Sequence, residues 1–233
     1  MFEQRSYSAE LLDNDDIPAQ DLYQNLRELD FINRYLGGHD VVIKAIKKML
    51  ADLPKSREIH LLEIGSGGGD NLRAIAKWGK KSGYNFKLTG VDLKKDCTDF
   101  AVENSQKFDI EFLTSDYREA PFNRIGKPDI VFNSLFCHHF TDDQLTSMLK
   151  WMDENTTVGY TICDLHRHPL AYFSIKLLTS LFSKSYLVKN DAPLSVRRGF
   201  VKKELNSLLT DAHQKSFKIK WAWAFRWIVT AKH

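Results

Sequence analysis

The sequence contains little cysteine and proline and no long uninterrupted apolar run. Its three cysteines, Cys97, Cys137 and Cys163, lie far apart and form no CxxC pair, which argues against a disulfide framework and against a paired-cysteine metal site. The most apolar long segment, residues 170–188, includes two lysines and several hydroxyl groups, so we do not expect a membrane span. The formal net charge of +3 is too small to indicate a polyanion such as a nucleic acid as the partner.

The amino-terminal stretch MFEQRSYSAELLDNDD lacks the apolar core of a secretory signal. Together with the sparse cysteines, this favours a reducing, cytoplasmic location. The 233 residues suffice for a well-buried core, and a composition of 43% apolar and 27% charged residues is ordinary for a globular domain. We expect a helical cap segment over residues 1–54 and one α/β domain over residues 55–233.

Segments of helical and strand periodicity alternate along most of the chain. Helical spacing is found over residues 9–36, with a break near Pro18, and again between Gly37 and Pro54. Strands are expected at residues 59–64, 86–93, 110–114, 129–135, 158–163, 217–221 and 226–231. Helices are expected between them at residues 71–80, 99–107, 142–153 and 201–211. The alternation predicts a largely parallel sheet with helices on both faces and an antiparallel edge formed by the last hairpin.

Residues 165–195 interrupt this alternation. An apolar stripe at helical spacing runs through them and consists of Leu170, Phe173, Leu177, Leu178 and Leu181. Packing into the core and a lid over a site are both open interpretations of this stripe.

A glycine-rich turn follows the first expected strand, in the stretch LLEIGSGGGD of residues 61–70. A strand, a glycine turn and a helix together are typical of a site for an adenosine cofactor. A dinucleotide fingerprint would need a third glycine at position 70, which is Asp70. Glu63 adds a second carboxylate beside the turn, and two carboxylates repel a pyrophosphate but attract an ammonium group. The turn therefore argues against NAD or a flavin dinucleotide.

Acidic residues also end the next two strands. Asp92, followed by Leu93, lies at about the distance from the glycine turn that is expected for an acid accepting both ribose hydroxyls. Asp116, followed by Tyr117, could accept a hydrogen bond from an adenine amino group. These acids and the glycine turn are expected at the edge where open α/β sheets bind their ligands.

Taken together, these motifs resemble those of the class I methyltransferases that use S-adenosyl-L-methionine. The resemblance covers residues 55–165 and the final hairpin. It implies a Rossmann-like, seven-stranded mixed sheet with an antiparallel last strand, and S-adenosyl-L-methionine as the cofactor. The cofactor contacts that it implies are Glu63, Gly65, Ser66, Gly67, Asp92, Leu93, Asp116, Tyr117 and Asn133.

A weaker resemblance concerns the residues before the first strand. The stretches LREL at 26–29 and NRYLGGH at 33–39 are similar to the leading segment of small-molecule methyltransferases encoded beside polyketide synthases. In such enzymes an N-terminal helix folds over the cofactor. This implies that Arg34 pairs with the methionine carboxylate through a bidentate fork, the alternative being an ion pair on the surface.

The stretch NSLFCHHF at residues 133–140 is expected where the fourth strand opens into the site. It resembles the His-His-Phe segment of quinone and polyketide methyltransferases and departs from the Asn-Pro-Pro-Tyr motif used on nucleobase and protein amines. Methyl transfer to a hydroxyl benefits from a base that titrates near neutral pH. The candidates are His138, His139 and His166, with Asp164 able to orient one of them. Adjacent histidines rarely chelate one ion together, so we expect no metal.

The resemblance and the apolar insert together predict methyl transfer to a small apolar or aromatic acceptor, such as a polyketide, phenol or quinone of secondary metabolism, with oxygen favoured. In this fold the segment after the fifth strand often caps the acceptor. The residues expected to line its pocket are Phe173, Leu177, Leu181 and Phe182. The alternatives are an enzyme that methylates RNA or protein, a cofactor-binding protein without catalysis and, least favoured, a dinucleotide-dependent oxidoreductase. The acceptor, carbon against oxygen methylation and the oligomeric state do not follow from the sequence.

Overall fold

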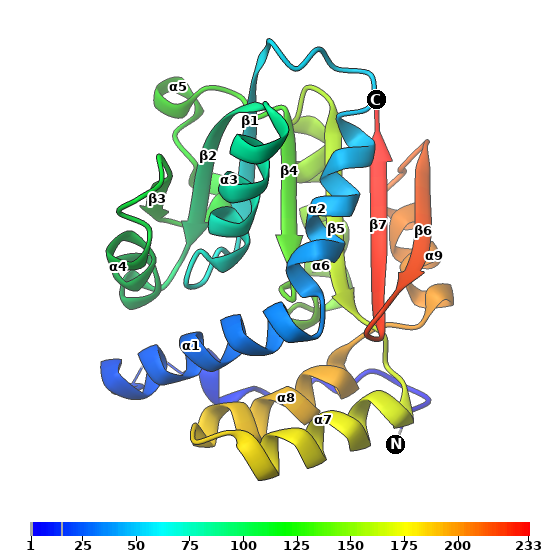
Figure 1. Cartoon of the computed structure of the whole chain (residues 1–233). Coiled ribbons are helices and arrows are strands. Elements are labelled where there is room, and N and C mark those ends of the chain that lie inside the picture. Colours follow the sequence, from blue (N-terminus) through cyan, green and yellow to red (C-terminus); the bar gives the residue numbers. More distant parts are fainter. Residues whose placement is uncertain (1, 15) are drawn as a thin grey trace.

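A twisted sheet of seven strands crosses the computed structural model, which describes residues 2–14 and 16–233 (Figure 1). The strands are β1 (Glu58–Ile64), β2 (Asn85–Asp92), β3 (Glu111–Thr114), β4 (Ile130–Ser134), β5 (Gly159–Leu165), β6 (Phe217–Ala222) and β7 (Arg226–Lys232). Their order in the sheet is β3-β2-β1-β4-β5-β7-β6. Strands β1 to β5 run parallel, and β7 lies antiparallel between β5 and β6. This confirms the expected Rossmann-like mixed sheet, and every expected strand is present with its ends moved by at most two residues.

The central strands are nearly continuous apolar runs, because helices cover both faces of the sheet there. In β1 every residue after Glu58 is buried, and β4 is buried as far as Asn133. The edge strand β6 instead exposes Lys218 and Lys220. Lysines on an edge strand discourage pairing with the strand of another molecule.

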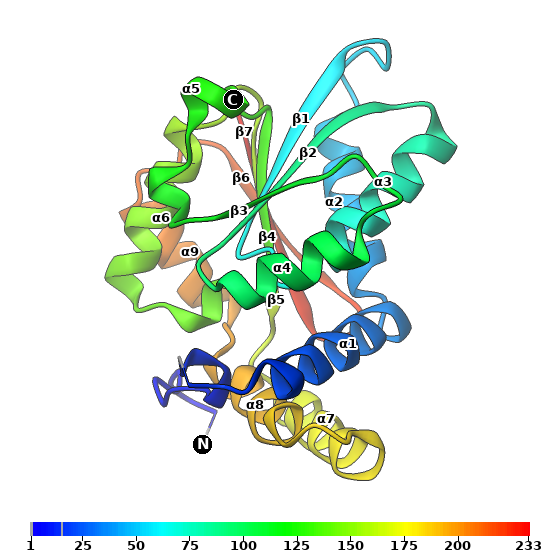
Figure 2. The same cartoon turned by 90° about the vertical axis from the view of Figure 1, so that its left-hand side faces the viewer.

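Helices lie on both sides of the sheet, with α2 and α3 on one side and α6 and α9 on the other (Figure 2). The helices are α1 (Ala19–Tyr35), α2 (Gly38–Met49), α3 (Asp70–Ser82), α4 (Lys95–Asn104), α5 (Phe122–Ile125), α6 (Asp142–Glu154), α7 (Pro169–Phe182), α8 (Tyr186–Arg198) and α9 (Lys202–Asp211). Short 3₁₀ turns occupy Leu11–Asp13, Tyr117–Glu119 and Cys137–His139. The sheet therefore divides the apolar core into one cluster around Ile46 and Ile75 and another around Met148 and Leu208.

Helix α4 is displaced from its expected position, because it begins at Lys95 rather than at residue 99. Its buried face consists of Cys97, Phe100 and Ala101, which follow one another at helical spacing. Charged residues surround the first of these positions, so the apolar periodicity is visible in the sequence only from Phe100 onward.

Helices α1, α7 and α8 form a layer across the carboxyl-terminal ends of the parallel strands (Figure 1). Glu28 of α1 fastens this layer, since its carboxylate accepts hydrogen bonds from the backbone N–H groups of Lys184 over 2.9 Å and Ser185 over 3.1 Å. Helices α7 and α8 are the insert expected over residues 165–195. The layer covers the edge at which a doubly wound sheet binds its ligands.

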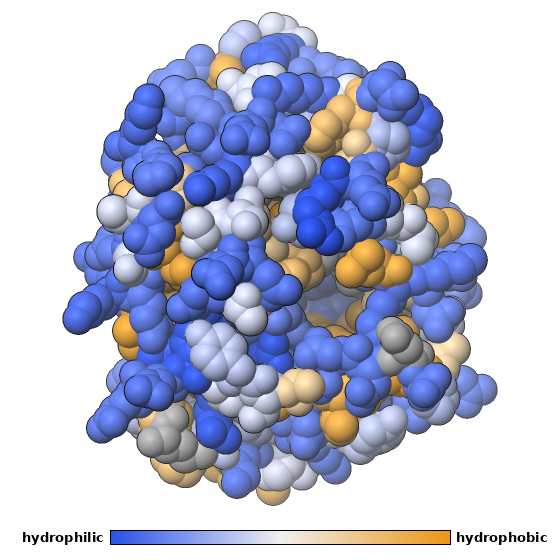
Figure 3. Space-filling model, turned by 180° about the vertical axis from the view of Figure 1, so that it is seen from behind, coloured by the Kyte–Doolittle hydropathy of each residue, from blue (hydrophilic) through white to orange (hydrophobic). Residues whose placement is uncertain are grey.

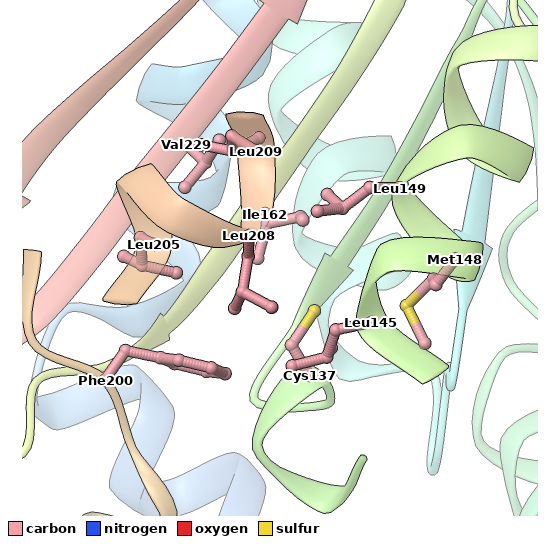
Figure 4. Close-up of a pocket in the computed structure, with 10 residues that line it drawn as sticks. All are labelled: Cys137, Leu145, Met148, Leu149, Ile162, Phe200, Leu205, Leu208, Leu209 and Val229. Carbon is pink, nitrogen blue, oxygen red and sulfur yellow. The ribbon is translucent and has the colours of Figure 1, made fainter. Parts of the chain in front are cut away.

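A small apolar void lies in the core between α6, α9 and the strands β5 and β7 (Figure 4). Its volume is about 20 Å³, and its walls include Leu145, Ile162, Phe200 and Leu208. A space of this size holds about one water molecule, and an apolar wall offers that water no hydrogen-bond partner. The void is therefore an imperfection of packing rather than a ligand site.

Candidate functional site

A cavity of about 910 Å³ lies between the carboxyl-terminal ends of β1, β2, β4 and β5 and the layer of α1, α7 and α8. Sites for small molecules commonly measure about 300–1,000 Å³. Seen from behind, the surface of the molecule shows a hollow with apolar side chains along it (Figure 3). The polar residues of its lining include a group at the glycine turn, here called the polar end, and a group at the paired histidines, here called the histidine end, and helix faces add apolar residues.

The glycine turn forms one wall of this cavity through residues 65–68. Gly65 and Gly67 have φ angles of +66° and +49°, in the left-handed region that favours glycine. A Cβ atom on Gly65 would lie 2.2 Å from the ring of Phe136, so a side chain is excluded there as well. The N–H of Gly67 donates a hydrogen bond to Asp92 Oδ2 over 2.8 Å, which ties the end of β2 to the turn.

Glu63 stands at the end of β1 with only 1% of its surface exposed. Its Oε1 accepts a hydrogen bond from Asn71 Nδ2 over 2.8 Å. Its Oε2, together with Ser66 Oγ and Asn71 Oδ1, finds no hydrogen-bond partner within residues 2–14 and 16–233. Burial and the nearby Asp70 raise the pKa of Glu63 well above its usual value. Buried polar atoms without partners are costly, so this corner suits a polar or cationic group of a ligand.

Asp92 and Leu93 line the next part of the cavity, and Tyr117 lines it from beyond β3. Asp92 also accepts a hydrogen bond from the backbone N–H of Lys94 over 3.0 Å. Burial raises the pKa of Asp92. The structure thus brings the glycine turn, Glu63, Asp92 and Tyr117 to one cavity, and their contacts with a cofactor stay a prediction.

Three of the residues predicted to contact the cofactor lie elsewhere. The side chain of Arg34 is exposed and reaches only an aspartate one helical turn earlier, at 3.9 Å. Asp116 caps the turn after β3, where its Oδ1 accepts a hydrogen bond from the N–H of Arg118 over 2.9 Å. Asn133 is fully buried in β4 and accepts a hydrogen bond from Cys137 Sγ over 3.4 Å. None of these three residues is among those that line the cavity, and their contacts with a cofactor stay a prediction.

At the histidine end of the cavity, Asp164 holds His138. His138 lies in the 3₁₀ turn after β4 with 3% of its surface exposed, and its Nδ1 is 2.8 Å from Asp164 Oδ1 on β5. Burial alone would raise the pKa of Asp164, yet His138 holds it below its usual value, so the carboxylate is ionised. This contact keeps a proton on Nδ1 and leaves Nε2 as the basic nitrogen.

Two acids that the sequence did not predict as site residues, Glu10 and Asp13, contact the histidines. Glu10 Oε1 is 3.6 Å from His138 Nε2, and Asp13 Oδ1 is 2.9 Å from His139 Nδ1. Arg198 approaches Glu10 at 3.7 Å and Asp13 at 3.4 Å. No spacing or motif relates these acids to the histidines, because the tertiary path of the chain alone brings them together.

Glu10 makes the stability of the protein depend on pH. Burial raises its pKa from 4.5 to about 7, so this carboxyl stabilises the fold below pH 4.5 and the stabilisation is lost as the pH rises towards 7. Glu10→Gln, which keeps the shape of the side chain, is expected to raise the free energy of unfolding at pH 8 by at most about 3 kcal/mol, and by much less at pH 5. Urea unfolding at the two pH values measures this difference.

The matched control for that variant is Asp13→Asn. Burial raises the pKa of Asp13, but His139 outweighs burial and brings the pKa to about 2. Its ionised form is therefore the stabilising one at neutral pH, and Asp13→Asn is expected to lower the stability at pH 8. If Glu10→Gln raised the free energy of unfolding equally at pH 5 and pH 8, the result would contradict the raised pKa of Glu10.

The third predicted base, His166, does not line the cavity. Its backbone N–H donates to the carbonyl of Phe225 over 2.8 Å, and it forms a β-bridge with Phe200. Its Nδ1 accepts a hydrogen bond from Trp221 Nε1 over 3.3 Å. Backbone pairing thus gives His166 a structural role beside the final hairpin, and its role as a base stays a prediction.

Two groups of side chains could offer ligand atoms to a metal ion. They are Glu10, His138 and His139, and Asp30, His39 and Asp70, with the atoms of each group within 4.8 Å of one another. The first group includes neither Asp164, which lies on the Nδ1 side of His138, nor His166, whose backbone pairs with Phe200. Arg198 already places a positive charge beside Glu10. The expectation of no metal stays a prediction.

Arg226 lines the cavity, whereas the sequence predicted only that it belongs to a strand. It begins β7 and is 3% exposed, and its guanidinium donates to the carbonyls of Leu36 over 3.2 Å and Ala224 over 3.3 Å and to Asn33 Oδ1 over 3.4 Å. Its Nε has no partner among the described residues, and no ion pair found among them includes Arg226. Burial lowers its pKa. A buried cation without an anion suits a ligand carboxylate.

The apolar wall of the cavity comes from one side of α7 and α8. Ile175 and Leu178 of α7 and Val188 and Val196 of α8 face the cavity. The residues expected there instead point outward with 59%, 60%, 65% and 77% of their surfaces exposed, namely Phe173, Leu177, Leu181 and Phe182. Helix α7 is apolar on two sides, so periodicity locates a stripe without showing which side faces the site.

Comparison with known proteins agrees with this geometry. Residues 61–159 match the model of a protein family described as a methyltransferase domain. A search of the curated proteins gave no match. Among solved structures, the magnesium protoporphyrin IX methyltransferase of Synechocystis PCC 6803 with bound S-adenosylmethionine is 12% identical, with a TM-score of 0.58 over 94% of this chain and 99% of that one.

Two further solved structures are similar over most of their length. The plantazolicin methyltransferase BpumL, in complex with a monoazolic desmethylPZN analog and S-adenosylhomocysteine, is 18% identical, with a TM-score of 0.65 over 92% of this chain and 89% of that one. An S-adenosylmethionine-dependent methyltransferase from Aquifex aeolicus is 16% identical, with a TM-score of 0.61 over 90% of this chain and 97% of that one.

The family match extends from β1 to the first residue of β5 and so includes the glycine turn, Asp92 and His138. Within the described ranges, no helix is both long and apolar enough to cross a membrane. The likeness to the solved structures establishes the fold. Residues 61–159 thus match a methyltransferase domain, and the chain has the Rossmann-like fold of the S-adenosylmethionine-dependent methyltransferases to which it is similar.

Proposed function

We propose that this protein transfers the methyl group of S-adenosylmethionine to a small apolar or aromatic acceptor, with oxygen as the favoured acceptor atom. One observation carries the proposal: a single cavity joins the unpartnered polar atoms beside the glycine turn to the His138–Asp164 pair. The proposal includes a cytoplasmic enzyme of secondary metabolism, with residues 1–54 as a cap over the site.

The polar end of the cavity suits the cofactor. The carboxyl group of Glu63 and the free oxygens of Ser66 and Asn71 would receive the ammonium group of its methionine part. Asp92, which accepts a hydrogen bond from the N–H of Gly67, would accept the ribose hydroxyls. Two of the similar structures contain S-adenosylmethionine or S-adenosylhomocysteine, which supports the same ligand here.

The histidine end suits the acceptor. S-adenosylmethionine brings a methyl group that is already activated as a sulfonium, so orientation of the acceptor supplies much of the acceleration. His138 Nε2 would take the proton of an acceptor hydroxyl, while Asp164 holds the ring and stabilises the imidazolium that forms. Ile175, Leu178 and the other apolar residues of the wall would exclude water from the transferring methyl.

The nature of the wall favours a small acceptor over a macromolecule. Its residues are aliphatic, and the net charge of the chain is only +3. The magnesium protoporphyrin IX methyltransferase and BpumL are named for small acceptors of their own, which is consistent with an acceptor of this kind.

Calorimetric binding followed by a transfer assay tests the proposal. We expect heat on titration with S-adenosylhomocysteine and none with NAD, and transfer of labelled methyl to a panel of phenols and hydroquinones. Heat with NAD alone would overturn the cofactor assignment. Binding of S-adenosylhomocysteine with transfer only to RNA or protein, or with no transfer to any of the three classes, would overturn the acceptor assignment.

A further inference from the structure

The outer face of α7 is an apolar stripe open to solvent. Leu170, Phe173, Leu177 and Leu181 follow one another at helical spacing, and between 59% and 65% of the surface of each is exposed. Phe182 extends the stripe to the end of the helix. Large apolar patches of this kind mark surfaces that contact a partner or a membrane.

This stripe adjoins the cavity. Leu178 is 41% exposed and also lines the cavity, so it stands where the apolar surface and the cavity meet. Trp223, in the connection between β6 and β7, is exposed and lines the cavity too. On α1 the rings of Phe31 and Tyr35 are exposed and lie 4.4 Å apart, and each is next in sequence to a lining residue, Ile32 or Leu36.

The segment that carries the stripe has basic but no acidic residues, and the nearby Glu28 of α1 is bonded to the backbone at its end. Residues 165–190 contain no aspartate or glutamate. Lys176, Lys184 and Lys189 are exposed in the same segment. An apolar helix face with aromatic residues and lysines beside it is typical of helices that lie in the interface of an anionic membrane.

We propose that the stripe of α7 rests on the surface of a bilayer containing anionic lipid. The leucines and phenylalanines would enter the boundary between headgroups and acyl chains, while Lys176, Lys184 and Lys189 contact lipid phosphates. The junction at Leu178 and Trp223 then opens the cavity towards the bilayer, from which an apolar acceptor enters. Attachment to lipid is independent of the proposed function, whereas entry of the acceptor from the bilayer rests on it.

A second copy of the chain fits this surface less well. Two stripes packed face to face would bring lysines of the same sign together, and residues 165–190 offer no carboxylate to compensate them. An anionic bilayer matches both the apolar side chains and the lysines.

Co-sedimentation with vesicles tests the proposal. We expect the wild-type protein to bind vesicles of phosphatidylcholine with phosphatidylglycerol more tightly than vesicles of phosphatidylcholine alone. Leu177→Glu combined with Leu181→Glu is expected to weaken binding to the anionic vesicles at least about tenfold. Replacing Lys176, Lys184 and Lys189 by glutamine is expected to lower partitioning about fivefold for each lysine.

A matched control is Val102→Glu, a similar change at an exposed apolar residue of α4 away from the stripe, which is expected to bind vesicles as the wild type does. All variants should retain their affinity for S-adenosylhomocysteine, which shows that they are folded. The proposal would be overturned if the wild-type protein bound neither vesicle type, or if the double leucine variant bound anionic vesicles as tightly as the wild type does. If the wild type binds no vesicles, sedimentation velocity shows whether it is a dimer. A dimer that the double leucine variant no longer forms would assign the stripe to contact with a second copy instead.

Discussion

Replacing His138 by alanine is expected to slow methyl transfer by about 10²–10⁴-fold, the usual contribution of a general base. The affinity for S-adenosylhomocysteine should stay unchanged, because the side chain of His138 contacts Asp164 and Glu10 rather than the glycine turn. The expectation rests on the 2.8 Å contact with Asp164, which fixes the ring and leaves Nε2 as its basic nitrogen. Single-turnover transfer of labelled methyl, with calorimetry of cofactor binding, measures both quantities.

Two matched variants give this experiment its controls. His139→Ala changes the adjacent ring, which is more exposed and bonded to Asp13, and is expected to reduce transfer far less. Asp164→Asn removes the carboxylate that sets the tautomer of His138 and should reduce transfer in the same direction as His138→Ala, with a shifted pH profile. Wild-type rates in His138→Ala would refute the base assignment, and loss confined to His139→Ala would move it to His139.

The second large effect is expected at Arg226. Arg226→Gln should raise the Kd for S-adenosylhomocysteine by about 10–100-fold, the cost of losing a hydrogen-bonded charge, if the guanidinium holds the carboxylate of the methionine part. The same variant should bind 5′-methylthioadenosine, which lacks that carboxylate, as the wild type does. The ratio of the two dissociation constants therefore isolates the carboxylate contact from any general damage to the fold.

Arg34→Gln is the control for this comparison, because the sequence suggested that residue for the same contact. Its side chain is exposed and outside the cavity, so both dissociation constants should remain at their wild-type values. Equal weakening of both ligands in Arg226→Gln would show a structural role for Arg226. Weakening of S-adenosylhomocysteine in Arg34→Gln alone would restore the interpretation of the sequence.

The fold could be predicted because its signals are local. Apolar runs between helical segments mark the strands, and a strand, a glycine turn and a helix follow one another within residues 61–70 and beyond. The cofactor end of the cavity follows from the same signals, since Glu63, Gly65 and Asp92 sit at strand ends that a parallel sheet gathers at one edge.

The histidine end could be predicted only in part. His138 and Asp164 end neighbouring strands, so the sequence brings them together through the order of the sheet. Glu10 meets His138 across more than a hundred residues, and Arg226 reaches the cavity from the last strand, so no local pattern reveals either. The sequence also predicted the wrong side of α7 as the one that faces the cavity. Leu177 points outward, although its helix does cover the cavity.

The segment before α1 carries a practical consequence. Arg5 fastens it to the body of the protein, with its Nη1 2.6 Å from Asp142 and its Nε donating to the carbonyl of Arg198 over 3.0 Å. This segment also carries Glu10 and Asp13, which contact His138 and His139. A protease nick or a bulky tag in this segment would therefore disturb the contacts of His138 and His139. Preparations with a modified amino-terminal segment should be checked by a transfer assay as well as by a binding assay.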